Sequence, residues 1–170
     1  MTNQIEIVSG LPADFTSSER TKFQELVAHA GEVIGGAMTA NIADARALVM
    51  LKRGGIVRGG AALKRPRGSY REKIMKQAAA ALLESDYPYE LGYVFVEPSL
   101  QGCGLSHLLV SEALAHSDGA AVFATARTDN DAMRATLCKA GFVAMGRPYP
   151  GQQGRSIGLL LKAEDMPGHS

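Results

Sequence analysis

Several features that mark other classes of protein are absent from this sequence of 170 residues. Its two cysteines, Cys103 and Cys138, are too few for a disulfide framework, so we expect a reducing compartment, the cytoplasm. No hydrophobic run approaches the roughly 18 residues of a membrane helix, and the N-terminus lacks the basic and apolar regions of a signal peptide. The formal net charge is only +1 with 46% hydrophobic residues, which is typical of a soluble globular protein. We expect one domain over residues 1–170, with no membrane partner.

Two common phosphate-binding loops are also missing. A Walker A loop needs a Gly-Lys pair, and none occurs in the chain. A Rossmann fingerprint needs a third glycine after Gly102 and Gly104, where His107 stands instead. The histidines and cysteines show no metal-ligand spacing, so we expect no metal site.

What is present is a strand, a glycine turn and a helix within residues 90–106 and beyond. Leu91–Val96 is an apolar strand, and Pro98 ends it because proline cannot donate to a ladder. The apolar positions of the helix that follows are Leu105, Leu108, Leu109 and Ala113. In between, Gly102 and Gly104 let the backbone approach a ligand closely, and the first N–H groups of the helix have no intrahelical partner. The pattern predicts an anion pocket suited to a diphosphate, with an ordinary glycine-capped turn as the alternative.

This turn resembles the Q/R-x-x-G-x-G/A turn of the Gcn5-related N-acetyltransferase (GNAT) superfamily, which holds the pyrophosphate of coenzyme A. Gln101 and Gly104 match it, whereas Ser106 stands where the family has Gly or Ala. Serine is small and has a hydroxyl to donate to a phosphate. A second match, to the family's N-x-x-A-x-x-L-Y-x-K-x-G-F segment, consists of Asn130, Lys139, Gly141 and Phe142. Together the matches cover roughly the second half of the chain.

The resemblance implies an α/β (α+β) fold with a mixed, mostly antiparallel central sheet of about six to seven strands, flanked by helices and splayed at the coenzyme strand. It implies acetyl-CoA as cosubstrate, no metal, and direct attack by a primary amine in a ternary complex. The coenzyme-binding residues that it implies are Val94, Phe95, Val96, Gln101, Gly102, Cys103, Gly104, Leu105, Ser106 and Asn130. For Asn130 the alternative is a helix N-cap, which asparagine favours.

The resemblance also assigns catalytic roles. Glu90 lies eleven residues before Gln101, the offset of the base glutamate in the histone-acetylating branch of the family. The alternative for Glu90 is a carboxylate at the strand edge with no role beyond solubility. The Val96 amide is our choice of donor to the thioester carbonyl oxygen. The family's usual acid, a tyrosine, is replaced by Leu137, so either Tyr149 serves as the acid or the thiolate leaves unassisted.

Local patterns predict the remaining elements. Thr16 and Glu19 form a capping box, and the helix after it buries Phe23, Leu26, Val27 and Ala30. A hairpin joins Ala45–Leu51 to Ile56–Leu63 through Gly54 and Gly55. The other expected elements are strands at Gln4–Val8, Ala120–Ala126 and Ser156–Lys162, helices at 32–39 and Tyr70–Leu83, and a loop at Tyr149–Gly154. The helix at 70–83 lies where the simplest GNAT plan has a tight connection.

Basic residues are concentrated in one segment, Lys52–Lys76. It holds nine of the chain's 18 lysines and arginines, opposed only by Glu72. Three interpretations remain: a solvated surface, attraction of the coenzyme's phosphates, or attraction of an anionic acceptor, including nucleic acid. Few aromatic residues lie among the basic ones, which disfavours base stacking.

The leading hypothesis is an N-acetyltransferase whose acceptor is a small-molecule or protein amine. The alternatives are a nucleic-acid-directed protein on the same scaffold and a non-catalytic acetyl-CoA sensor, the latter motivated by Leu137. The sequence does not choose among a protein N-terminus, a lysine, a polyamine, an antibiotic and an amino acid as acceptor. A homodimer is a further expectation, because dimers are frequent in the family.

Overall fold

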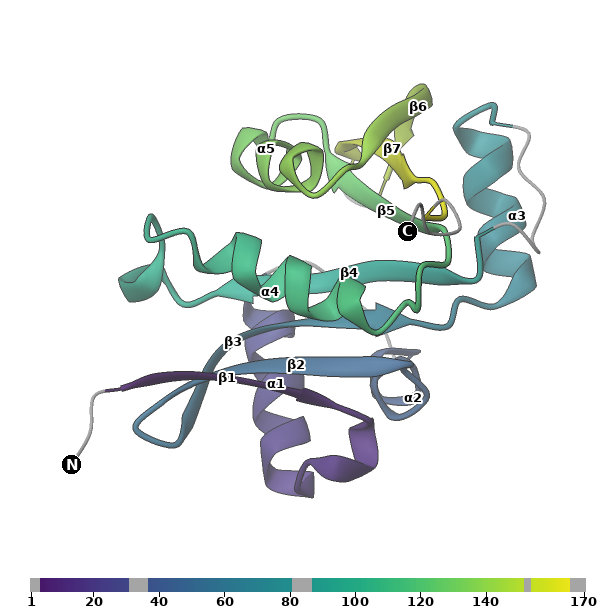
Figure 1. Cartoon of the computed structure of the whole chain (residues 1–170). Coiled ribbons are helices and arrows are strands. Elements are labelled where there is room, and N and C mark those ends of the chain that lie inside the picture. The colour runs from purple at the N-terminus through teal and green to yellow at the C-terminus, as the bar shows by residue number, and fades with distance from the viewer. Residues whose placement is uncertain (1–3, 31–36, 81–86, 152–153, 166–170) are drawn as a thin grey trace, which may run out of the picture. The chain divides into compact units, whose positions relative to one another are not determined.

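The structure is a computed structural model and describes residues 4–30, 37–80, 87–151 and 154–165. The chain divides into two compact units, the first formed by residues 1–65 and 91–116 and the second by 66–90 and 117–170. Each unit combines strands with flanking helices, and the described residues form seven strands in all (Figure 1). This α/β architecture confirms the predicted fold class. The expectation of one domain over residues 1–170 stays a prediction.

The first unit holds four strands in the order β1-β2-β3-β4. Their bounds are Ile5–Gly10 for β1, Ala47–Arg53 for β2, Ile56–Lys64 for β3 and Tyr89–Val96 for β4. The first two residues of β4 belong to the second unit. β2 runs antiparallel to both β1 and β3. The predicted β2–β3 hairpin is confirmed, and its turn residues Gly54 and Gly55 have φ values of 58° and 81°, as tight hairpin turns require.

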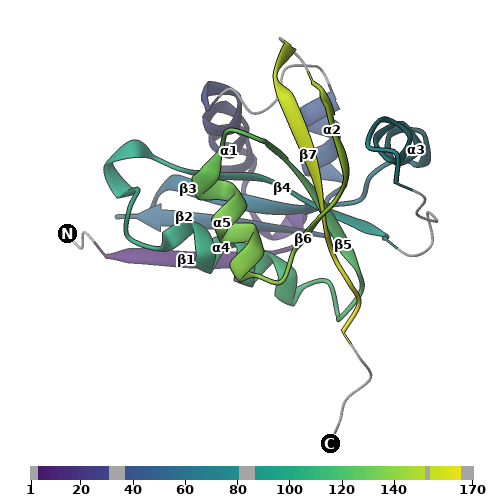
Figure 2. The ribbon, with the colours of Figure 1, turned by 90° about the horizontal axis from the view of Figure 1, so that it is seen from above.

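Helices cover both faces of these strands. The helices are α1 (Ser17–His29), α2 (Ala37–Ala43) and α4 (Leu105–Ala115). α1 and α2 lie on one face and α4 on the other (Figure 2). Because side chains alternate along a strand, Leu48 and Met50 of β2 join Phe23 and Val27 of α1 in one buried cluster. The opposite face receives the buried residues of α4, Leu109, Val110 and Ala113.

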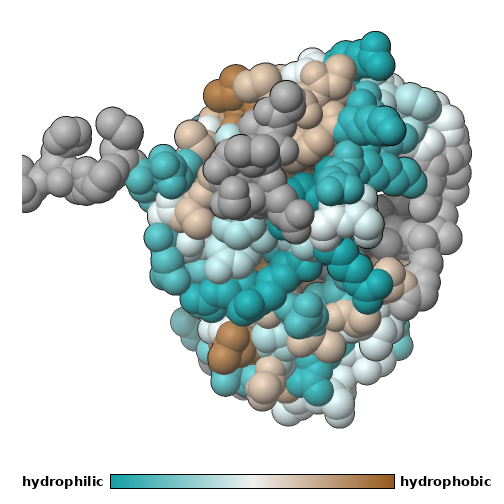
Figure 3. Space-filling model, turned by 90° about the vertical axis from the view of Figure 1, so that its right-hand side faces the viewer, coloured by the Kyte–Doolittle hydropathy of each residue, from teal (hydrophilic) through white to brown (hydrophobic). Residues whose placement is uncertain are grey.

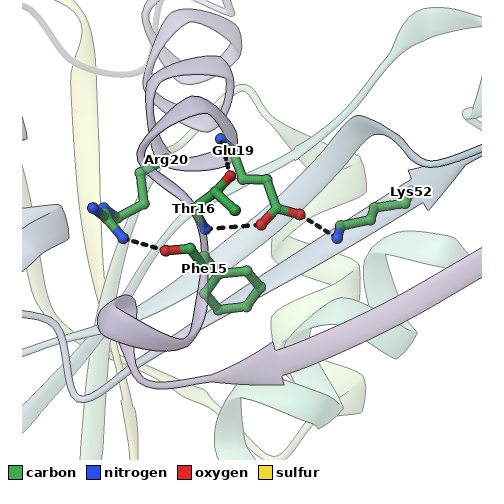
Figure 4. Close-up of polar contacts among 5 residues, drawn as sticks. All are labelled: Phe15, Thr16, Glu19, Arg20 and Lys52. Carbon is green, nitrogen blue, oxygen red and sulfur yellow. Dashed lines mark hydrogen bonds and ion pairs between the residues drawn. The ribbon is translucent and has the colours of Figure 1, made fainter.

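The start of α1 confirms the predicted capping box (Figure 4). The Thr16 hydroxyl oxygen accepts from the Glu19 N–H at 3.1 Å, and the Glu19 carboxylate accepts from the Thr16 N–H at 2.9 Å. Lys52 of β2 forms an ion pair with the same carboxylate, and Arg20 donates to the carbonyl of Phe15. The Lys52 ammonium, followed by the Thr16 N–H, lowers the pKa of Glu19. These contacts fix the start of α1 against β2.

The second unit has three strands in the order β5-β7-β6, both pairs antiparallel. Its elements are α3 (Gly68–Gln77), β5 (Val122–Arg127), α5 (Asp131–Lys139), β6 (Val143–Pro150) and β7 (Ser156–Lys162). α3 and α5 lie on opposite sides of these strands (Figure 2). Ile74, Met75 and Ala78 of the α3 segment pack on Phe123 and Leu159, and this cluster forms the core of the unit.

Several expectations are wrong in detail. Ala30 is the exposed C-cap of α1 and Leu108 is 50% exposed on α4, so neither is core. Tyr149 and Pro150 belong to β6 and not to a loop, because β6 pairs with β7 there. The second helix runs to Ala43, and its expected residues 32–36 lie outside the described residues. Of the helix expected at 70–83, residues 81–83 also lie outside them.

Among the described residues, no helix is both long and apolar enough to cross a membrane.

Candidate active site

The predicted coenzyme turn connects β4 to α4 in the first unit. A short 3-10 turn, Pro98–Leu100 (η3), follows β4, and Gly104 directly precedes α4. Gly102 and Gly104 have φ values of 84° and 77°, in the left-handed region that favours glycine. A Cβ at either position would meet no other atom within 4 Å. The backbone of the turn is therefore open to a ligand, beside helix N–H groups that lack intrahelical partners.

Gln101 has a local role that the sequence did not predict. Its side-chain Nε2 donates to the Val96 carbonyl at 2.8 Å, which ties the turn to the end of β4. Cys103 is exposed in the turn, whereas Leu105 and Ser106 are half-buried in the first turn of α4. The predicted coenzyme residues of the first unit all lie within one stretch of the chain, from Val94 at the end of β4 to Ser106 in the first turn of α4.

The strand before this turn has an irregular backbone. Tyr93 has a φ of 54°, which is uncommon for a non-glycine residue and interrupts the extended strand just before Val94–Val96. Asn41 donates to the Tyr93 hydroxyl at 3.2 Å, and the Lys64 ammonium lies 4.3 Å from the ring centroid. A Cβ on Gly92 would lie 2.7 Å from Cε of Lys64, so the glycine makes room for this stacking. Val94, Phe95 and Val96 are themselves buried.

Glu90, the predicted base, is held in the second unit. Its side chain is only 2% exposed, so the interpretation of a surface carboxylate serving solubility is wrong. A carboxylate removed from water needs hydrogen-bond donors. The hydroxyl of Tyr70, from α3, donates to Oε2 of Glu90 at 2.8 Å. The sequence did not indicate Tyr70 as a partner, because it lies twenty positions before Glu90.

Tyr149, the predicted acid, belongs to the same unit and is 8% exposed. Burial, and after it the negative charge of Glu90, raises the pKa of Tyr149 to about 12. The phenol therefore keeps its proton at neutral pH. The two side chains predicted to be catalytic interact electrostatically within one unit.

The second family segment has a structural explanation for most of its residues. Asn130 is the N-cap of α5, since its Oδ1 accepts from the Met133 N–H at 3.1 Å. Leu137 is buried, and its side chain cannot donate a proton. Gly141 has a φ of 103° just after α5, in the left-handed region that favours glycine at the end of a helix. The contact of Asn130 with the coenzyme stays a prediction.

Some of the basic residues in the segment Lys52–Lys76 contact other residues of the chain or are buried. Lys52 pairs with Glu19, Arg58 lies 3.2 Å from Glu97, Lys64 stacks on Tyr93, and Arg71 is buried. Four of the nine basic residues thus have an internal role. Figure 3 shows the face that includes α3, where hydrophilic residues predominate and hydrophobic ones are scattered. The attraction of the coenzyme's phosphates or of an anionic acceptor, including nucleic acid, stays a prediction.

Comparison with known proteins identifies the fold. No family model matches the sequence, and no curated protein matches it. Solved structures do match, among them a GNAT-family acetyltransferase from Streptococcus pneumoniae, with 16% identity, a TM-score of 0.65 and coverage of 95% of this chain and 100% of that one. The chain has the GNAT fold.

Two further matches have the same architecture. The ribosomal-protein-S18-alanine N-acetyltransferase from Escherichia coli is 16% identical, with a TM-score of 0.64 and 98% of each chain covered. A chain of the NatC complex bound to Gag peptide and CoA is 14% identical, with a TM-score of 0.67 and coverage of 94% of this chain and 99% of that one. At these identities the likeness shows the GNAT fold alone, so the roles of individual residues depend on the geometry above.

Proposed function

We propose that this chain is an acetyl-CoA-dependent N-acetyltransferase that transfers an acetyl group to a primary amine, with Glu90 as the general base. The observation that carries the proposal is the open glycine turn at Gly102 and Gly104, directly before α4. A related fold supports acetyl-CoA as the ligand, since the NatC complex, one chain of which matches this one, is bound to CoA. The proposed acceptor is a small-molecule or protein amine.

The turn fits a diphosphate for two physical reasons. Main-chain N–H groups at the start of α4 are donors without intrahelical acceptors, and the helix dipole places positive partial charge there. The two glycines leave the space beside them empty, so a phosphate can approach the backbone. The residues proposed to hold the coenzyme are Val94, Phe95, Val96, Gln101, Gly102, Cys103, Gly104, Leu105, Ser106 and Asn130.

Acetyl-CoA supplies the thioester, and the chain supplies proton transfer and charge stabilisation. Glu90 takes a proton from the acceptor amine, directly or through a water, so that the nitrogen can bond to the acetyl carbon. The Val96 N–H donates to the carbonyl oxygen as that oxygen gains negative charge. Tyr149 donates its proton to the sulfur as the carbon–sulfur bond breaks.

The coupling of Glu90 and Tyr149 favours this order of proton transfers. While Glu90 is charged, it helps to raise the pKa of Tyr149, and the phenol holds its proton. Once Glu90 has accepted the amine proton, that charge is neutralised and the pKa of Tyr149 falls. The acid therefore becomes stronger only after the base has acted.

Substitution of Gly104 tests the coenzyme site. Gly104→Glu places a carboxylate in the open space of the turn, and we expect acetyl-CoA to raise the melting temperature of the wild type but not of this variant. Gly55→Glu is the matched control, because Gly55 also has a positive φ, 81°, and open space around its Cβ position. This control carries the same strain and charge and should still respond to acetyl-CoA. If acetyl-CoA does not stabilise the wild type, the proposed function is wrong.

A coenzyme sensor is the second candidate, because a buried leucine, Leu137, occupies the position of the family's usual acid. A sensor would bind acetyl-CoA without releasing coenzyme A in the presence of any amine.

A further inference from the structure

Helix α3 lies between β3 and β4 in the sequence. The hydroxyl of its residue Tyr70 donates a hydrogen bond to Glu90, the proposed base. We propose that Tyr70 of this helix is a positioning residue for Glu90. It orients the carboxylate and favours its charged form. This inference rests on the proposed function, since Glu90 has a catalytic role only if amine acetylation occurs.

The two side chains differ sharply in exposure. Glu90 is 2% exposed whereas Tyr70 is 40% exposed, and the Tyr70 hydroxyl lies 2.8 Å from Oε2 of Glu90. The tyrosine therefore reaches from the surface of α3 to a carboxylate that bulk water does not contact. A hydrogen bond donated to a carboxylate stabilises its charged form and limits its rotation.

The helix that carries Tyr70 is anchored, so the hydroxyl has a defined position. Ile74, Met75 and Ala78 are buried in the core of the second unit. At the C-terminal end, the Ala78 carbonyl accepts from the Arg147 N–H at 2.8 Å. A Cβ on Gly146 would collide with the same carbonyl, so β6 approaches the helix end closely.

The first turn of α3 is also fixed. Arg71, adjacent to Tyr70, is 5% exposed, and its Nη2 donates to the Pro66 carbonyl at 3.4 Å. Among the described residues of this unit, Arg71 from α3 and Tyr149 from β6 are the other buried titratable groups. These contacts fix the backbone of α3, from which the Tyr70 side chain reaches Glu90.

Two variants separate positioning from a structural role. Tyr70→Phe removes only the hydroxyl. Tyr89→Phe makes the same chemical change on β4, one residue from Glu90 and on the opposite face of the strand. With the amine that gives the fastest coenzyme release in a panel, we expect Tyr70→Phe to lower kcat about 10-fold. The KM for acetyl-CoA should not change, and the acid limb of the pH–rate profile should move to higher pH. Tyr89→Phe should match the wild type in all three respects.

A second measurement needs neither acceptor nor coenzyme. In protein labelled with ¹³C at glutamate carboxyls, the resonance lost in Glu90→Gln identifies Glu90. We expect the chemical shift of this carboxyl carbon to change in Tyr70→Phe, which loses the hydrogen bond, and to be the same as in the wild type in Tyr89→Phe. An unchanged chemical shift in Tyr70→Phe would overturn the inference. If the wild type fails to bind acetyl-CoA, the proposed function fails instead, and the chemical shift still decides whether Tyr70 holds Glu90.

Discussion

Burial affects the chemistry of Tyr149 more than charge does. Removal from water is the larger cause of its raised pKa, and the carboxylate of Glu90 is the second. Both effects disfavour the phenolate, so the side chain is a neutral hydrogen-bond donor in the folded protein near neutral pH. The raised pKa of Tyr149 therefore reflects, in part, the nearby negative charge of Glu90. A tyrosine with the ordinary pKa would not reveal that charge.

This shift makes stability depend on pH in the alkaline range. The folded-state pKa, about 12, lies above the ordinary value of 10.0, so the stabilisation is fully present below pH 10. It is lost as pH rises through the folded value, because the unfolded chain releases the proton first. We expect the free energy of unfolding to fall more steeply above pH 10 in the wild type than in Tyr149→Phe, measured by urea titrations at several pH values. Parallel curves for the two proteins would show that Tyr149 is not shifted.

At two residues, Glu90 and Tyr93, the structure shows properties that the sequence alone did not predict. The spacing of Glu90 from Gln101 identified a candidate base, but the alternative of a surface carboxylate could not be decided without its burial. Apart from the neighbouring Gly92, the sequence did not indicate that Tyr93 would have a positive φ. Both depend on contacts with residues distant in sequence, such as Tyr70, Asn41 and Lys64.

At the scale of elements, β3 packs so closely against its neighbours at Gly60 that a larger side chain would collide with them. A Cβ on Gly60 would lie 2.5 Å from the Val49 carbonyl oxygen of β2 and 2.6 Å from the Phe23 ring of α1. The glycine therefore permits β2, β3 and α1 to approach one another. The same close packing is absent at Gly158 of β7, where the nearest atom would be 3.7 Å away.

A pair of alanine substitutions measures this packing. We expect Gly60→Ala to destabilise the protein by about 3 kcal/mol, the upper end for overpacking, because a backbone carbonyl cannot move aside easily. Gly158→Ala is the matched control in another strand and should change stability by less than about 1 kcal/mol. Chemical denaturation of both variants gives the comparison. Equal effects would mean that the close approach at Gly60 does not limit stability.

Elements with local determinants were predicted well. The capping box of α1 and the Gly54-Gly55 hairpin depend on residues near in sequence, and both are confirmed. β6 was not predicted, since its strand character at Tyr149 depends on pairing with β7. Leu108 satisfies the helical period of α4 and is nevertheless exposed, because periodicity does not show how wide the covered face is.

At the scale of the whole molecule, the residues proposed for the reaction are divided between the two units of the chain. The first carries the coenzyme turn from Val94 to Ser106, and the second carries Glu90, Tyr70 and Tyr149. The GNAT fold could be inferred from the sequence because the turn and the segment after Asn130 have fixed spacing. The acceptor could not, because its binding surface has no motif of fixed spacing.

The most direct test of acetyl transfer is the amine-dependent release of coenzyme A from acetyl-CoA. The wild type should be assayed with a polyamine, an amino acid, an aminoglycoside, a lysine peptide and a peptide with a free N-terminus, beside Glu90→Gln. We predict that at least one amine accelerates thiol release by the wild type, and that Glu90→Gln lowers this rate most near neutral pH while still binding acetyl-CoA. Thiol release that no amine accelerates, or that is unchanged in Glu90→Gln over the whole pH range, would contradict the account.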